Sequence, residues 1–257
     1  MSGTVLAVGD VCGESGLLFL EKHLRSLKKH YGADFCVVNG ENAAVTGVTP
    51  QQAEAMLSAG ADAVTLGNHA FSRRQISRML DDSPYILRPA NFAPQVPGRG
   101  WADYETAFGM VRVINLIGRC EMPFGPDNPF FEADRILKKD PPKVVLVDFH
   151  AEATSEKAAL AYYLDGRATA VWGTHTHVQT SDARVLPGGL GFITDLGMTG
   201  PCESVIGIRP EQSISIFLGD LPVRHETAPG PCKIEGAVFE IDETTGKCLS
   251  VEAIRIV

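Results

Sequence analysis

Polar side chains stand at the end of one apolar run after another in this chain of 257 residues. Asp10 follows the first run, at residues 4–9. Glu41 with Asn42, and then Asn68 with His69, follow the next two runs. Helical patterns separate these runs, which is typical of an α/β sheet with crossover helices. Because the carboxyl ends of parallel strands share one edge, where open α/β sheets bind ligands, we expect these side chains to meet there.

Two later apolar runs end in histidines. His150 follows residues 144–147, and His175 and His177 follow residues 170–172. With His69, four of the seven histidines therefore fall at strand ends. One such histidine would more simply be a hydrogen-bonded structural residue, but imidazoles and carboxylates gathered together are ligands for Zn, Fe or Mn. The donors are too many for one tetrahedral ion, so the pattern predicts two ions that share a carboxylate.

The apolar periodicity also predicts the elements of the fold. We expect helices over residues 17–31, 50–60 and 155–164, with another opened by Ser72 and Gln75. Thr49, Pro50 and Gln52 suit the start of the second helix, and Gly32 and Gly60 suit helix ends. Strands are expected at residues 4–9, 35–38, 63–66, 110–116, 143–147, 168–172, 213–218, 236–241 and 249–257. We expect the first part to form a mixed sheet and the C-terminus to complete a second sheet facing it, with the helices outside.

Composition narrows the class of protein. Apolar residues are 44% and charged residues 21% of the chain, as in folded proteins, and its length suits one domain over residues 1–257. The net charge of −8 disfavours long nucleic acids as partners. No run approaches the roughly 18 apolar residues of a membrane helix, and the N-terminus lacks a signal-peptide pattern. Six dispersed cysteines without a C-x-x-C pair favour reduced thiols in the cytoplasm.

The order of the strand-end motifs carries a resemblance to a known family. Asp10, the triplets at 40–42 and 67–69, His150 and the GTHTH run at 173–177 together resemble the calcineurin-like metallophosphoesterases. Further segments resemble the bacterial YmdB branch: NGENA at 39–43, RPANF at 88–92, DFHAEATSEK at 148–157, GTHTHVQT at 173–180 and TDLGMTGP at 194–201. The resemblance implies a four-layer α/β/β/α sandwich of two mixed sheets, a dinuclear metal centre and phosphodiesterase activity, with 2′,3′-cyclic nucleotides among the substrates.

The resemblance also implies roles for single residues. Glu41 would bridge two ions, with a hydroxide between the ions as the nucleophile. His69 would be the general acid that protonates the leaving ribose oxygen, and opening at the 2′ side would leave a 3′-phosphate. One ion would be held by Asp10, Glu41, Asn42 and His177, and the other by Glu41, Asn68, His150 and His175. Mixed nitrogen and oxygen donors suit Fe or Mn, with Zn or Co as alternatives, in divalent or trivalent form.

Three positions depart from the wider superfamily. Cys12 stands where a histidine is usual, either as a soft ligand or as a small buried side chain. Glu41 replaces the usual bridging aspartate, and Asn42 takes the place of a missing histidine; the YmdB branch shares both. Ala70 replaces the acidic residue that usually follows Gly-Asn-His, so the group that orients His69 is not evident from the sequence.

Other readings stay open at this point. The same fold and ions would suit a phosphomonoesterase or nucleotidase, or a regulator that binds metal or nucleotide without catalysis. The resemblance makes a homo-oligomer plausible. Arg119 could contact phosphate or form a surface salt bridge, and residues 154–156 could cap a helix. Trp101 and Phe124 are candidates for stacking on a base, with ordinary packing as the alternative.

Overall fold

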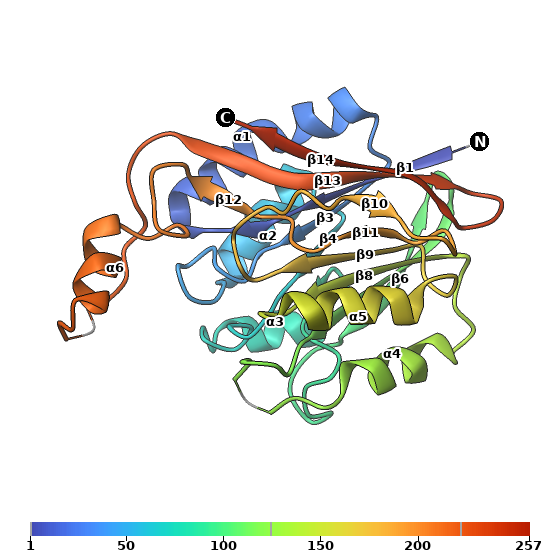
Figure 1. The fold of residues 1–257 in the computed structure, drawn as a ribbon, viewed down its shortest axis with the longest axis horizontal. Helices are drawn as coiled ribbons and strands as arrows, with labels where there is room; N and C mark the ends of the chain where they lie inside the picture. Colours follow the sequence, from blue (N-terminus) through green and yellow to red (C-terminus); the bar gives the residue numbers. More distant parts are fainter. Residues whose placement is uncertain (1, 124, 222) are drawn as a thin grey trace.

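The protein is described by a computed structural model, which covers residues 2–123, 125–221 and 223–257. Two β-sheets lie face to face, and helices cover their outer faces (Figure 1). This arrangement is the four-layer α/β/β/α sandwich of two mixed sheets expected from the sequence. Within the described ranges, no helix has both the length and the apolar character to cross a membrane.

The first sheet has eight strands and contains both ends of the chain. Its order is β2-β12-β13-β1-β3-β4-β5, and β14 pairs with β13. The strands β1, β3, β4 and β5 run parallel, while β13 is antiparallel to β1, β12 and β14. The strand bounds are β1 Ser2–Val8, β2 Asp10–Val11, β3 Phe35–Asn39, β4 Ala63–Thr65, β5 Ile86–Leu87, β12 Met198–Pro201, β13 Cys232–Asp242 and β14 Cys248–Ile256.

The second sheet has six strands and is formed by the middle of the chain. Its order is β10-β11-β9-β8-β7-β6, in which β7, β8, β9 and β11 run parallel. The strand bounds are β6 Trp101–Thr106, β7 Gly109–Ile117, β8 Val144–His150, β9 Ala170–Thr174, β10 Arg184–Val185 and β11 Gly191–Ile193. Both sheets therefore contain a run of parallel strands whose carboxyl ends can carry a site.

Six helices complete the described fold. Their bounds are α1 Gly13–Tyr31, α2 Pro50–Ala59, α3 Ile76–Asp82, α4 Pro129–Leu137, α5 Thr154–Leu164 and α6 Pro210–Phe217. The first three pack on the eight-stranded sheet, and α4 and α5 pack on the six-stranded sheet. In contrast, α6 stands away from the sandwich (Figure 1).

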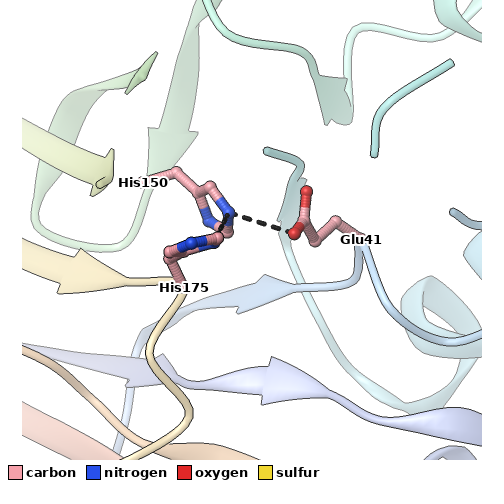
Figure 2. A group of neighbouring side chains, drawn as sticks. All are labelled: Glu41, His150 and His175. Atoms are coloured by element: carbon pink, nitrogen blue, oxygen red, sulfur yellow. Dashed lines mark hydrogen bonds and ion pairs between the residues drawn. The ribbon is translucent and has the colours of Figure 1, made fainter. Parts of the chain in front are cut away.

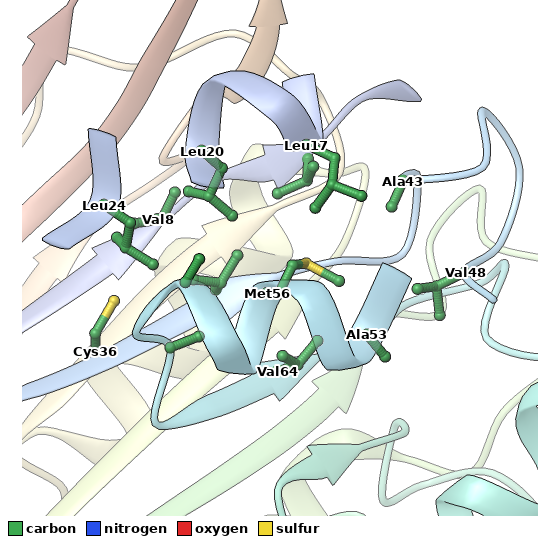
Figure 3. Packing of buried hydrophobic residues seen from close by; sticks show 14 of the residues in the cluster. Val8, Leu17, Leu20, Leu24, Cys36, Ala43, Val48, Ala53, Met56 and Val64 are labelled. Carbon is green, nitrogen blue, oxygen red and sulfur yellow. The ribbon is translucent and has the colours of Figure 1, made fainter. Parts of the chain in front are cut away.

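Three apolar layers hold the sandwich together. In β1, Leu6 and Val8 face the helices, whereas Val5 and Ala7 face the other sheet, as the two-residue period of a strand requires. Figure 3 shows the first layer, in which side chains of α1 and α2 meet the sheet. Between the sheets, the rings of Trp172 and Phe239 lie 5.5 Å apart. Each fully buried apolar side chain of this size contributes about 1.5–3 kcal/mol.

The predicted start of α2 is confirmed. The Thr49 side chain accepts a hydrogen bond from the Gln52 amide, and the Gln52 side chain bonds back to Thr49. Gly32 and Gly60 end α1 and α2 in the left-handed conformation, also as expected. The next helix begins later than the expected start at Ser72, because α3 begins at Ile76 with Gln75 as its N-cap.

Two expectations about the last sixty residues are wrong. Residues 213–218 do not form a strand, since Pro210–Phe217 is helix α6. Alternating Ser and Ile residues there mimic the two-residue period of a strand, whereas Pro210 stands at the first turn of a helix. The C-terminal strands also join the first sheet rather than complete the second, because Gly236–Asp242 of β13 pairs with all of β1, and β14 pairs with β13.

Candidate metal centre

The carboxyl ends of the parallel strands bring all the predicted ligands to one edge of the sandwich. The eight-stranded sheet supplies Asp10, the first residue of β2 just after β1, together with Glu41 and Asn42 after β3 and Asn68 after β4. The six-stranded sheet supplies the three histidines, with His150 as the last residue of β8 and His175 and His177 just beyond β9. The site therefore lies between the two sheets, with oxygen donors from one sheet and nitrogen donors from the other.

Three donor groups converge on Nε2 of His150. Its Nε2 atom lies 3.0 Å from Oε1 of Glu41, 3.0 Å from Oδ1 of Asn68 and 3.0 Å from Nδ1 of His175. Figure 2 shows how Glu41, His150 and His175 point toward one another. One ring nitrogen cannot serve three such partners with a single proton. Lone pairs directed at a common point are the arrangement that a metal ion requires.

A second group of donors lies around His177. His177 Nε2 is 3.1 Å from Nδ2 of Asn42 and 3.6 Å from Oδ1 of Asp10. Asn42 Nδ2 also lies 3.3 Å from Oε1 of Glu41. Glu41 thus touches members of both groups, which is the position expected of a bridging carboxylate.

The residues present fit two cations. Among the described residues, Oδ1 of Asp10 is fully buried yet accepts no hydrogen bond, a costly state for a carboxylate oxygen unless a cation satisfies it. Gly67 leaves room beside the donors, because a Cβ atom there would lie 2.3 Å from both Glu41 and His150. Carboxylate, imidazole and amide donors together suit Fe, Mn or Zn.

A buried network orients His150. Its Nδ1 atom lies 2.9 Å from Oγ1 of Thr174, whose hydroxyl donates to Asp148 at 2.7 Å. Because the Thr174 hydroxyl donates its only proton to Asp148, the Thr174 oxygen accepts a hydrogen bond from Nδ1–H of His150. The lone pair on Nε2 of His150 is then free for a metal. The Thr65 hydroxyl and the Asn39 amide also donate to Asp148. Burial raises the pKa of Asp148 to about 6, against the lowering effect of these donors.

Glu152 and Asp10 orient His175. The Glu152 carboxylate lies 3.1 Å from Nε2 of His175, and the His175 backbone N–H donates to Oδ2 of Asp10 at 3.1 Å. Nδ1 of His175 therefore faces the cluster. Burial, together with the neighbouring His150, lowers the pKa of His175 to about 4, so the ring is neutral as a ligand must be. For His150, burial lowers the pKa, but the neighbouring carboxylates of Glu41, Asp10 and Asp148 together raise the pKa, and the net shift is upward.

A buried ion pair holds the turn that carries His175 and His177. Both histidines have positive φ, 106° and 63°, which is uncommon for side chains of this kind. Lys157 Nζ lies 2.7 Å from Oδ2 of Asp195, and the same oxygen accepts from the Thr176 backbone N–H at 3.2 Å. The ion pair thus ties the turn to α5 and to the segment before β12.

The structure shows the surroundings of two positions where the sequence departs from the superfamily pattern, Cys12 and Ala70, which follows His69. Cys12 is buried, and its Sγ lies near both ring nitrogens of His177, 3.4 Å from Nδ1 and 3.9 Å from Nε2. Ser72 Oγ lies 3.5 Å from Nδ1 of His69, where the sequence left the orienting group open. The His69 backbone N–H donates to Oε2 of Glu41 at 3.0 Å. His69 is therefore tied to the centre through its backbone and to Ser72 through its ring.

A pocket of about 530 Å³ opens onto the centre, within the range of small-molecule sites. On one side it is lined by Glu41, Asn42, His69, His175 and His177. The opposite wall comes from residues 206–208, 225 and 227, at the base of the α6 region.

The sequence did not identify several supporting residues. They are Asn39, Thr65, Asp148, Glu152, Lys157, Thr174 and Asp195. The available signal was polar residues within otherwise apolar runs, such as Asp148 in β8 and Lys157 on α5.

The weaker candidates have structural roles or stay open. The ring of Trp101 lies 4.3 Å below the Arg112 guanidinium and so takes part in packing, whereas Phe124 lies outside the described residues. The cap at residues 154–156 is not formed, because the N-cap of α5 is Ala153. Instead, the Glu156 carboxylate accepts from the Arg119 backbone N–H at 3.0 Å.

Comparison with known proteins places this geometry in context. Residues 6–254 match the family model described as YmdB-like protein. The 2′,3′-cyclic-nucleotide 2′-phosphodiesterase of Bacillus subtilis is 43% identical over 255 residues, covering 98% of this chain and 96% of that protein. A solved structure of a hypothetical protein from Thermus thermophilus has 38% identity and a TM-score of 0.92, with 98% of both chains covered. A phosphatase structure from Mycoplasma pneumoniae has 35% identity and a TM-score of 0.94, covering 100% of this chain and 94% of that chain.

Proposed function

The chain belongs to the YmdB-like family of metal-dependent phosphoesterases, and from that premise we propose how its own residues carry out the reaction. The protein is a hydrolase with the calcineurin-like metallophosphoesterase fold. Our proposal is that it cleaves small phosphodiesters, above all 2′,3′-cyclic nucleotides, and opens them to 3′-nucleotides. The observation that carries the proposal is the convergence of Glu41, Asn68, His150 and His175 around one point in a pocket whose wall contains His69.

The ligand set follows from the two groups of donors. Asp10, Asn42 and His177 would hold one ion, and Asn68, His150 and His175 the other, with Glu41 shared. Bound ions would lower the pKa of water from 15.7 toward about 7 and offset the charge of the phosphate. The chain supplies the geometry: the Thr174–Asp148 pair holds His150, and the Glu152 carboxylate holds His175. Fe or Mn suits this set, since its donors are imidazole nitrogens and carboxylate or amide oxygens.

His69 would supply the proton that the reaction needs. Its side chain lines the pocket, while the ligand set is complete without it. As the oxygen of a water molecule bonds to phosphorus, the bond between phosphorus and the 2′ oxygen breaks. His69 would donate a proton to that oxygen, which becomes the free 2′ hydroxyl of the 3′-nucleotide. A positioned general acid of this kind contributes about 10²–10⁴-fold to the rate.

Free thiols support a cytoplasmic location. All six cysteines are unpaired in the structure, and four are buried. An oxidising compartment would favour disulfides in such a chain.

Hydrolysis of 2′,3′-cyclic AMP by the Mn²⁺-loaded protein tests the proposal. A simple phosphomonoester and the variants His69→Ala and His30→Ala are assayed beside it, and metal content is measured in each sample. We expect metal-dependent cleavage of the diester. The rate should fall about 10²–10⁴-fold in His69→Ala with metal retained, and should be unchanged in His30→Ala, which alters an exposed residue of α1.

Other outcomes would contradict the proposal in different ways. A clear preference for the monoester would favour the nucleotidase alternative. Full metal content without turnover of either compound would favour a binding protein that does not catalyse. A fully active His69→Ala variant would remove His69 from the mechanism.

A further inference from the structure

A second pocket, distinct in chemistry from the metal centre, lies against the segment that carries Asn68 and His69. It has a volume of about 410 Å³ and is lined by Asn68, Phe71, Ser72, Phe92, Ala93 and Val96. None of these six side chains carries a charge, so the pocket is not built for phosphate. It is instead walled by two aromatic rings and small apolar groups, with an amide and a hydroxyl at one end.

The pocket adjoins the proposed reaction centre. Asn68 lines it and also places Oδ1 3.0 Å from Nε2 of His150. Ser72 lines it and lies 3.5 Å from the ring of His69. His69 itself lines the pocket above the metal centre. The segment 68–72 therefore separates two adjoining spaces, one polar and one apolar, with the candidate general acid between them.

The aromatic walls come from two loops that the fold brings together. Phe71 follows β4 and Phe92 follows β5, and their ring centroids lie 6.1 Å apart at an angle of 42°. Both rings are only partly buried, although they pack against the core under α2 and α3. Exposed ring surface at the mouth of a pocket leaves a face available for a flat ligand.

The loop that carries Phe92 is held rigidly. The neighbouring Asn91 is buried, and its amide donates to the carbonyl oxygens of Ile117 at 2.7 Å and Asp127 at 2.8 Å. Its Oδ1 accepts from the Ile117 backbone N–H at 2.9 Å. A platform fixed before binding loses little entropy when a ligand arrives. This anchoring also gives the RPANF segment a role that the metal centre does not explain.

We propose that this pocket binds the nucleobase of the substrate, by stacking on Phe71 and Phe92. This inference rests on the proposed function and deepens it, because it makes the protein selective for nucleoside cyclic phosphates over other small diesters. The order of groups in such a substrate matches the order in the protein. The phosphate lies at the metal centre, the 2′ oxygen lies at His69, and the base lies beyond His69 against the aromatic rings.

A substrate without a base separates this inference from the proposed function. The kcat/KM value is compared for 2′,3′-cyclic AMP and for methyl ribofuranoside 2′,3′-cyclic phosphate, which keeps the sugar and the cyclic diester. Stacking of a base on aromatic side chains corresponds to about 5–150-fold in affinity. We expect wild-type protein to prefer the nucleotide by a factor in this range. Phe92→Ala and Phe71→Ala should remove most of the preference while leaving kcat/KM for the base-free compound unchanged.

Leucine variants control for misfolding caused by the loss of apolar volume. A binding measurement tests the base site independently of catalysis. Phe92→Leu and Phe71→Leu retain apolar volume and should still lose preference, whereas Phe131→Leu, on the exposed side of α4, should not. Calorimetric titration with adenosine should show binding to wild type and to His69→Ala, and none to Phe92→Ala.

The two proposals fail differently in these experiments. Equal kcat/KM for the two diesters, or adenosine binding that survives loss of both rings, would overturn the base site and leave the phosphodiesterase intact. Adenosine binding that depends on Phe92 but is accompanied by no hydrolysis would support the base site and overturn the proposed reaction.

Discussion

The edge that carries the metal centre and the region around α6 are built in opposite ways. At the edge, the polar groups Asp10, Glu41, Asp148 and His150 are fully buried and bonded into a network. In the arm, which we define as residues 209–226 without 222, apolar side chains face outward. Phe217, Leu218 and Leu221 are 88%, 80% and 85% exposed. Polar groups are thus inside at one place and apolar groups outside at the other.

This difference in burial predicts how strongly substitutions in each region affect the protein. Hydrogen bonds close the base of the arm, as between the Arg209 backbone N–H and the Glu226 carbonyl oxygen, but only Ser213 of α6 is buried. A buried polar group that loses its partner keeps the cost of desolvation, whereas an exposed group is rehydrated. Substitutions at the edge should therefore have large effects, and substitutions in the arm small ones.

The largest effect on stability is expected from Lys157→Met. This change leaves the Asp195 carboxylate buried without its cation and frees the turn that carries His175 and His177. Breaking such a pair costs about 3–5 kcal/mol of unfolding free energy, measured by chemical denaturation. Adding Asp195→Asn should restore part of the loss. A single variant within 1 kcal/mol of wild type would show that the ion pair does not hold the edge.

Glu41→Gln should act mainly on metal binding and activity. Glu41 touches His150, Asn42 and the His69 backbone, so its loss disturbs both groups of donors. Loss of a single outer partner of a metal ligand costs about 10–100-fold, and we expect a shared ligand to cost at least the upper value. Metal content and phosphodiesterase rate are measured together, with Glu21→Gln, on the exposed face of α1, as the matched control.

Metal removal should destabilise the edge without a mutation. Asp10 Oδ1 has no hydrogen bond among the described residues, so a cation that binds only the folded state stabilises that state. With free ion at 100 times its dissociation constant, the stabilisation is about 2.7 kcal/mol. The melting temperature should fall on chelation in wild type and much less in Glu41→Gln. An unchanged melting temperature after verified removal would contradict the coupling.

The Asp182 carboxylate, in the segment that follows His177, should make a smaller contribution to stability that is lost at acid pH. Burial alone would raise the pKa of Asp182, but hydrogen bonds from Thr194 and Thr180 outweigh burial and hold the pKa below 3.8. A carboxylate with a depressed pKa stabilises the folded state above its unfolded pKa, and the gain is lost as pH falls through the folded pKa. The difference in melting temperature between wild type and Asp182→Asn should therefore be full near pH 7 and shrink below about pH 4. A difference that persists at pH 2 would contradict this assignment.

The smallest effect is expected in the arm. Phe217→Ser replaces an apolar side chain that is already in water, so the unfolding free energy should change by less than about 0.5 kcal/mol. The phosphodiesterase rate should not change either. A loss of several kcal/mol would mean that the tip of the arm is covered in solution, and the contrast between arm and edge would not hold.

The sequence predicts buried strands of the fold correctly and fails in the exposed arm. Buried strands such as β3 and β8 are apolar runs because both their faces are covered, so the pattern alone locates them. The candidate ligands stand directly after these runs, and parallel strand ends must share an edge. The pattern fails at α6, where no packing selects between a helix and a strand.

The sequence by itself determined the α/β class, most element positions and the set of polar residues that meet at the candidate metal centre, because these depend on local periodicity and on chain order. Only the tertiary structure decided that β13 and β14 join the first sheet, that Asp148 and Thr174 orient His150, and that Phe71 and Phe92 pack together at the wall of a pocket. These contacts join segments far apart in the chain. A local pattern carries no record of them, since each segment would look the same with a different partner.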